Sequence, residues 1–98
     1  MEFMIPFRKR IDDLDDQIIE LLAQRFDVIR EVAHAKHERG VPSVIPERVM
    51  QVRERNAKHA EQKNIDPELI RAIYTRIIQA SCDLEDVMMS AMDDPGTE

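Results

Sequence analysis

The sequence predicts an all-α protein built from three helices, of which the first is long. Only two of its 98 residues are glycine, and hydrophobic residues make up 43% of the chain. The abundant Leu, Ile, Ala, Glu and Arg favour helix over strand. Three stretches with helical spacing of apolar residues, separated by glycine or proline, therefore predict three helices.

The first predicted helix runs from about Phe7 to about Arg39. Pro6 suits the start of a helix, because its missing N–H would have had no partner there. Gly40, followed by Pro42, is typical of a helix end, since glycine adopts the left-handed cap conformation easily.

The second and third helices follow from similar signals. The second is predicted from about Pro46 to about Lys63, again with a proline at its start. Asp66 is a good N-cap residue and precedes Pro67, so the third helix is predicted from there to about Ala91.

Bulk properties limit the kind of protein. A chain of 98 residues predicts one domain over 1–98, with flexible ends at about 1–6 and 93–98. The net charge of −6 argues against a nucleic-acid partner, and the chain lacks the apolar run of ~18 residues that a membrane span needs. The single cysteine, Cys82, cannot form an internal disulfide, which favours a cytoplasmic location.

The first helix carries an apolar seam with alternating three- and four-residue steps, at Ile11, Leu14, Ile18, Leu21, Val28, Val32 and Ala35. At the helical rise this helix is roughly 50 Å long, whereas a compact domain of this size has a radius of gyration of ~13 Å. The other two helices would leave part of the seam exposed. We therefore predict an intertwined antiparallel homodimer; the alternative is a single three-helix bundle with an overhanging first helix.

Charged residues interrupt the apolar pattern. Arg25 takes the place in the seam that Ile11, Ile18 and Val32 occupy in other heptads, and Lys36 lies about three turns later on nearly the same face. A buried charge must be paired or hydrogen-bonded. Arg8 lies on the same side of the helix as Lys36, but roughly 25 Å from Arg25. Only an antiparallel partner chain could therefore bring an Arg8 close to Arg25.

The other two helices add further polar groups beside their apolar positions. Arg48 lies in the first turn of the second helix, and Ser81 and Glu85 are one turn apart on the third. Several cations with one hydroxyl and one carboxyl predict a pocket for a small dianion, because arginine binds carboxylates in a bidentate manner. The alternative is a buried ion pair between Arg25 and Asp15 or Glu85.

Metal and nucleophilic sites are poorly supported. His34 and His37 are three residues apart, but no cysteine or carboxylate lies at metal-binding spacing from them. Glycine-rich phosphate loops and nucleophile elbows are also absent from the sequence. We therefore expect neither a metal nor a cofactor.

From Arg8 to about Met88 the chain resembles the all-helical chorismate mutases. No single stretch is decisive, but their order and spacing are fairly specific. The matching residues are Arg8, Ile11-Asp12-Asp13-Leu14-Asp15, Leu22-Ala23-Gln24-Arg25, Val32-Ala33-His34-Ala35-Lys36, Pro46-Glu47-Arg48, Ile77-Ile78-Gln79-Ala80-Ser81 and Glu85.

The resemblance implies an intertwined homodimer with two active sites, each built from both chains. Matched to the family, Arg8 of the partner chain would bind a substrate carboxylate. Arg25 and Arg48 would bind carboxylates from the chain that supplies most of the site. Lys36 and Glu85 flank the ether oxygen of the substrate. Ser81 matches a polar position near the ring.

The implied reaction is the pericyclic rearrangement of chorismate to prephenate in aromatic amino-acid biosynthesis, which makes the chain an isomerase. It needs no nucleophile, metal or cofactor. A protein can hold the reactive conformer and stabilise the negative charge that grows on the ether oxygen.

One departure from the family concerns Glu85, because the family often has glutamine there. Only a protonated Glu85 can donate to the ether oxygen; burial favours the neutral acid, whereas Lys36 favours the charged one. We therefore expect activity to fall as the pH rises and Glu85 loses its proton.

A second departure lies around Arg48. The family commonly has acids at the positions of Val49 and Ile45, where one of them binds the ring hydroxyl. The stretch here is similar to isochorismate pyruvate lyases, which form salicylate, and would also suit an aminodeoxychorismate mutase. The non-enzyme alternative is a helical dimerisation or regulatory module with a vestigial site.

Overall fold

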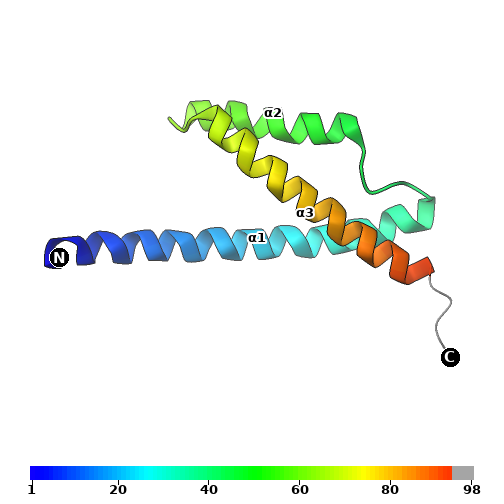
Figure 1. The fold of residues 1–98 in the computed structure, drawn as a ribbon, viewed down its shortest axis with the longest axis horizontal. Coiled ribbons are helices and arrows are strands. Elements are labelled where there is room, and N and C mark those ends of the chain that lie inside the picture. The colour runs from blue at the N-terminus through cyan, green and yellow to red at the C-terminus, as the bar shows by residue number, and fades with distance from the viewer. Residues whose placement is uncertain (94–98) are drawn as a thin grey trace.

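The computed structural model describes residues 1–93, which form three α-helices and no strand (Figure 1). The predicted all-α class and the three helices are confirmed. The predicted tail at 93–98 lies outside the described residues except for Asp93. Residues 1–6, for which flexibility was expected, include a short 3-10 helix, η1 (Glu2–Met4), and the first two residues of α1.

Helix α1 spans Ile5–Arg39, so it begins two residues earlier than predicted. It ends where Gly40 takes a left-handed φ of 66°, a conformation in which a side chain would be strained. The N–H of Gly40 donates to the His37 carbonyl, and the N–H of Val41 donates to the Lys36 carbonyl at 2.9 Å. This Schellman motif reverses the chain directly after Lys36.

Helix α2 spans Pro46–Gln62, and α3 spans Pro67–Asp93. Ile45 is extended, as expected for a residue before proline. The N–H of Glu68 donates to Asp66 Oδ1 at 2.9 Å, so the predicted N-cap at Asp66 is present. The small differences at the helix ends, at Gln62 and Asp93, lie within the usual uncertainty of such boundaries.

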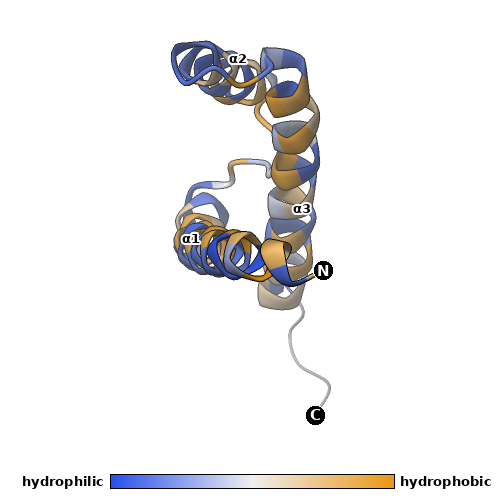
Figure 2. Cartoon of the chain, turned by 90° about the vertical axis from the view of Figure 1, so that its left-hand side faces the viewer, coloured by the Kyte–Doolittle hydropathy of each residue, from blue (hydrophilic) through white to orange (hydrophobic). Residues whose placement is uncertain are grey.

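Helix α3 joins the other two helices, since it packs against both α1 and α2 whereas these two make no direct contact within residues 1–93. Figure 2 shows the resulting open shape, in which α3 runs from α1 at one end to α2 at the other. The residues buried at these contacts are mostly small: Ala33 on α1, Ala57 and Ala60 on α2, and Ile78 on α3. Alanine lets helix axes approach closely, but it leaves a thin core.

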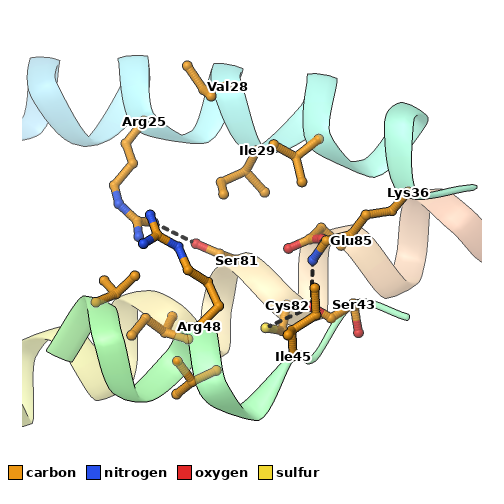
Figure 3. Close-up of a pocket in the computed structure, with 14 residues that line it drawn as sticks. Arg25, Val28, Ile29, Lys36, Ser43, Ile45, Arg48, Ser81, Cys82 and Glu85 are labelled. Atoms are coloured by element: carbon orange, nitrogen blue, oxygen red, sulfur yellow. Dashed lines mark hydrogen bonds and ion pairs between the residues drawn. The ribbon is translucent and has the colours of Figure 1, made fainter. Parts of the chain in front are cut away.

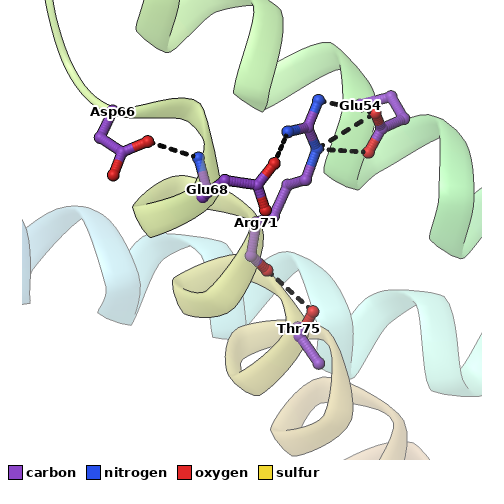
Figure 4. Close-up of polar contacts among 5 residues, drawn as sticks. All are labelled: Glu54, Asp66, Glu68, Arg71 and Thr75. Atoms are coloured by element: carbon purple, nitrogen blue, oxygen red, sulfur yellow. Dashed lines mark hydrogen bonds and ion pairs between the residues drawn. The ribbon is translucent and has the colours of Figure 1, made fainter.

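Arg71 links α2 and α3 near the point where these helices cross (Figure 4). Its guanidinium donates to both carboxylate oxygens of Glu54 on α2, at 3.0–3.2 Å, and also to Glu68 one turn back on α3. The hydrogen bond from Arg71 lowers the pKa of Glu54, and the same bond raises the pKa of Arg71.

The apolar seam of α1 is largely exposed in the single chain. Ile11, Leu14, Ile18 and Leu21 are each more than half exposed, and the radius of gyration is 17.7 Å. This value exceeds the ~13 Å of a compact domain of similar size. None of the described helices is long and apolar enough to cross a membrane. The predicted exposure of the seam is therefore confirmed, whereas the homodimer stays a prediction.

Candidate active site

A cavity of about 430 Å³ lies where α1, α2 and α3 face one another (Figure 3). Its lining comes from all three helices and from the link between α1 and α2. Six of the seven predicted site residues line it: Arg25, Lys36, Arg48, Val49, Ser81 and Glu85.

Two arginines occupy one end of the cavity. Arg25 Nη1 donates to Ser81 Oγ at 2.9 Å, and Ser81 Oγ in turn donates to the Ile77 carbonyl. Arg48 enters from the first turn of α2, and Figure 3 shows its side chain directed toward that of Arg25. Within residues 1–93 neither arginine forms an ion pair with an acid.

The alternative in which Arg25 forms a buried bridge with Asp15 or Glu85 is therefore wrong in this structure. Arg25 bonds to an uncharged hydroxyl, and Glu85 pairs with Lys36 instead. Two guanidinium groups without an acidic partner leave positive charge directed into the cavity. Such an arrangement suits a ligand with carboxylate groups, because guanidinium matches their geometry.

Lys36 and Glu85 occupy the opposite end. Lys36 Nζ lies 2.7 Å from Glu85 Oε1, and it donates a hydrogen bond to the Ser43 carbonyl, also at 2.7 Å. Glu85 is only 3% exposed. Its contact with Lys36 lacks the angle of a good hydrogen bond, so Oε1 has no hydrogen-bond partner within the described residues. A buried carboxyl with unused hydrogen-bonding capacity thus lies beside an ammonium group.

Apolar side chains separate the two polar ends. The wall consists of Val28, Ile29 and Val32 from α1, Ile45, Val49 and Val52 around the start of α2, and Ile78 from α3. Two positions at which the family commonly has acids, Val49 and Ile45, thus belong to this wall. The cavity suits a small ligand with an apolar body and anionic groups.

Two polar lining residues, Cys82 and Ser43, are not among the predicted site residues. Cys82 borders the cavity, and its Sγ donates weakly to the Ser43 carbonyl at 3.7 Å. Burial raises the pKa of the Cys82 thiol, which keeps it protonated and a poor nucleophile. Ser43, in the link between α1 and α2, is 8% exposed and donates from Oγ to Asp86 Oδ1 at 2.6 Å. No sequence signal marked either contact, because each joins residues about forty positions apart.

Arg8 is the predicted site residue that the cavity does not include. It lies near the start of α1, 17 residues before Arg25, which is roughly 25 Å along a helix. A single chain therefore cannot place Arg8 in this cavity, and its role stays a prediction that depends on a second chain.

The described residues contain no group of three or more His, Cys, Asp and Glu side chains arranged to hold a metal ion. His37 contacts Asp93 through Nε2, and the two residues pair the ends of α1 and α3. The expectation of a site without metal or cofactor stays a prediction.

The sequence matches the family described as chorismate mutase type II over residues 7–86. The chain belongs to the chorismate mutase type II family. Residues 7–86 include every predicted site residue, so the match covers the whole cavity and also Arg8.

Curated relatives agree with this family. The chain is 33% identical to the 4-amino-4-deoxychorismate mutase of Streptomyces pristinaespiralis, over 81% of this chain and 61% of that protein. It is 32% identical to the T-protein of Haemophilus influenzae, over 83% of this chain and 22% of that protein. It is 30% identical to the chorismate mutase of Methanocaldococcus jannaschii, over 81% of this chain and 80% of that protein.

The chain therefore spans under two thirds of the Streptomyces relative and about a fifth of the T-protein. A comparison with solved structures found no match.

Proposed function

We propose that this chain is a chorismate mutase, an isomerase that converts chorismate to prephenate in aromatic amino-acid biosynthesis. The observation that carries the proposal is how the charged groups divide the cavity. Arg25 and Arg48, which form no ion pair within residues 1–93, lie at one end, the Lys36–Glu85 pair lies at the other, and apolar side chains lie between them. Chorismate has one carboxylate on its ring and a second on its enolpyruvyl side chain, and the reactive ether oxygen joins this side chain to the ring. Family membership supports the same reaction.

In this proposal Arg25 and Arg48 bind the substrate carboxylates. Ser81 accepts a hydrogen bond from Arg25, which fixes the guanidinium before the substrate arrives. The apolar wall, including Val49, packs against the ring and favours the compact conformer in which the reacting carbons meet. Holding the reacting atoms in this geometry removes much of the entropic barrier.

Lys36 and Glu85 act at the ether oxygen. In the rearrangement the C–O ether bond breaks while a new C–C bond forms, and negative charge grows on the oxygen in the transition state. The Lys36 ammonium and a protonated Glu85 donate to that oxygen, and one such donor is worth ~3–4 kcal/mol of barrier. The rearrangement has no covalent enzyme intermediate and uses no metal or cofactor.

The proposed enzyme is a homodimer with shared sites. The exposed seam of α1 supports this arrangement, because a second α1 in antiparallel orientation would cover Ile11, Leu14 and Ile18. The same pairing would bring Arg8 of the partner chain toward Arg25 and complete the carboxylate site.

We place the enzyme in the cytoplasm, acting on a small dianion without nucleic-acid or membrane partners. The single free cysteine, Cys82, suits a reducing compartment. The net charge of −6 disfavours binding to nucleic acid, while the cationic cavity remains suited to a small anion.

A second candidate is an isochorismate pyruvate lyase or an aminodeoxychorismate mutase. The specific observation in its favour is that Val49 and Ile45 form part of the apolar wall, so neither offers an acid to a ring hydroxyl. A substrate with a different ring substituent would suit this wall equally well. Relatives named 4-amino-4-deoxychorismate mutase support the amino-substituted substrate.

One assay separates these activities. Purified protein is given chorismate, isochorismate and 4-amino-4-deoxychorismate in separate reactions, and prephenate, its amino analogue, salicylate and pyruvate are followed. Prephenate formation with the highest kcat/KM supports the mutase proposal. Salicylate with pyruvate, or a preference for the amino substrate, supports the second candidate. Turnover of none of the three overturns both.

A further inference from the structure

We propose that Ser43 and Asp86 are positioning residues for Lys36, an inference that rests on the proposed function. The hydrogen bond between their side chains ties the α1–α2 link to α3. This hydrogen bond holds the Ser43 carbonyl in the position from which it orients the Lys36 ammonium. Neither residue belongs to the group that touches the substrate in the proposal above.

The link after α1 folds around Lys36 at two points. The N–H of Val41 donates to the backbone carbonyl of Lys36 at 2.9 Å. Two residues later, the Ser43 carbonyl accepts from Lys36 Nζ at 2.7 Å. The direction of the lysine side chain therefore depends on where the backbone at Ser43 lies, since a lysine stem has four rotatable bonds and no rigid geometry of its own.

Ser43 is in turn fixed by α3. Its Oγ donates to Asp86 Oδ1 at 2.6 Å, and its side chain is nearly buried. Within the link at 40–45, Ser43 is the only described residue that forms hydrogen bonds with α3. The second of these bonds, from Cys82 Sγ, is long at 3.7 Å and therefore weak.

The position of Asp86 on α3 explains how its hydrogen bond with Ser43 can orient Lys36. Asp86 directly follows Glu85, so one turn of α3 supplies both the carboxyl beside the ammonium and the anchor for the carbonyl that the ammonium binds. A lysine ammonium has three protons. One goes to the Ser43 carbonyl and one faces Glu85, which leaves the third to point into the cavity toward the proposed ether oxygen.

The first test observes Lys36 itself and needs no turnover. Ammonium protons held by acceptors exchange slowly enough to give a ¹H–¹⁵N cross-peak, and Lys36→Arg assigns that peak among the four lysines. We expect the peak to broaden or vanish in Ser43→Ala and in Asp86→Ala. It should persist in Ser43→Thr, which keeps the hydroxyl, and in Asp86→Asn, which keeps the accepting oxygen.

Asp83→Ala is the matched control for this test. Asp83 is another exposed acid, one turn earlier on α3, and it has no hydrogen bond or ion pair within residues 1–93. Its removal changes the net charge as Asp86→Ala does and should leave the Lys36 peak unchanged. A Lys36 peak that is unaltered in both Ser43→Ala and Asp86→Ala overturns the proposal, whatever the enzyme turns over. Because Asp86 is exposed, Asp86→Ala keeps the test decisive if Ser43→Ala does not fold.

The second test measures kinetics with the best substrate of the product assay. Ser43→Ala and Asp86→Ala should each lower kcat by roughly 10- to 100-fold, with little change in KM, because a misdirected catalytic group affects the transition state more than the bound substrate. In a Lys36→Ala background, Ser43→Ala should lower kcat no further. An equal loss in both backgrounds would indicate a merely structural role and overturn the proposal. A wild-type protein without turnover would refute the proposed function alone, and the Lys36 peak would still decide this inference.

Discussion

Arg25 extends from α1 into the cavity, and its partner Ser81 carries no charge. In the proposed enzyme the missing negative charge is supplied by a substrate carboxylate. Arg25→Leu should therefore lower kcat/KM by roughly 30-fold to several thousandfold, because loss of one partner of a desolvated charged pair costs ~2–5 kcal/mol. Steady-state kinetics with chorismate measure the effect.

Arg30→Leu is the control for this change, since Arg30 is exposed on the same helix and, among the described residues, pairs only with Asp27. It should keep nearly full activity. The Arg25 result also addresses the non-enzyme alternative. If the wild-type protein turns over none of the three substrates and Arg25→Leu raises Tm, the result supports the alternative of a helical module with a vestigial site.

Glu85 is the second group that the proposal places at the ether oxygen. It is buried beside Lys36, and one of its oxygens has no hydrogen-bond partner among the described residues. Only a side chain with a hydrogen-bond donor can assist at the ether oxygen, so Glu85→Gln, which keeps a donor, should retain kcat. Glu85→Ala removes the donor and should lower kcat by ~10²–10³-fold in steady-state kinetics. A Glu85→Ala variant with the wild-type kcat contradicts this role.

The site residues differ in how visible they are in the sequence. Arg25 was predictable because it interrupts a heptad seam, and Lys36 because its spacing returns it to nearly the same face. Ser43 was not, since its contacts with Lys36 and Asp86 depend on how the link folds back over α3. The contacts of Ser43 become apparent only in the three-dimensional structure, whereas a charged residue in an apolar repeat is apparent from its spacing in the sequence.

At the scale of elements, proline and glycine made the helices predictable. Pro46 and Pro67 begin α2 and α3 as predicted, and Gly40 ends α1 through its left-handed backbone. The crossing of α3 over both other helices was not predictable, because each helix has apolar side chains that could pack in several ways. The crossing depends on tertiary contacts such as the buried alanines and Arg71.

The Arg71 contacts predict how stability at the α2–α3 crossing depends on pH. The pKa of Glu54 is lowered in the folded chain by its hydrogen bond from Arg71. A lowered carboxyl pKa contributes stability above the unfolded-state pKa, and this contribution is lost as the pH falls through the folded-state pKa. Arg71→Gln should therefore cause a small loss of stability at neutral pH and almost none in strong acid, as measured by urea unfolding.

The effect should be small because both side chains are accessible to solvent, which screens such pairs. Arg76→Gln is the control, because Arg76 lies on the same helix and, in the part of the chain that the structure describes, its side chain donates only to Gln79. It should leave the midpoint of unfolding unchanged at both pH values. An Arg71→Gln loss that persists undiminished in acid would show that the ion pair with Glu54 is not its cause.

At the scale of the whole molecule, the exposed seam of α1 is the dominant feature. Ile18 lies in the middle of it and is 54% exposed in the single chain. Ile18→Asp would place a charge where a second α1 is expected to pack, so it should convert a dimer to monomer in sedimentation experiments. Ala23→Asp adds the same charge on the opposite, exposed face of α1 and should remain dimeric. A wild-type protein that is already monomeric at micromolar concentration contradicts the dimer.

The shared site makes a further prediction that a dimer alone does not. Arg8 and Arg25 lie roughly 25 Å apart on one helix, so in the proposed dimer each complete site combines Arg25 of one chain with Arg8 of the other. Arg8→Ala and Arg25→Leu should each inactivate both sites of their own homodimer. When the two variants are unfolded and refolded together, a mixed dimer has one site with both arginines intact and one with neither. Random pairing makes half of the dimers mixed, so activity should return to about a quarter of the wild-type value.

Recovery should require the mixture, and each variant refolded alone should stay inactive. If the mixture also stays inactive while mixed dimers form, the shared site is wrong even though the dimer is right.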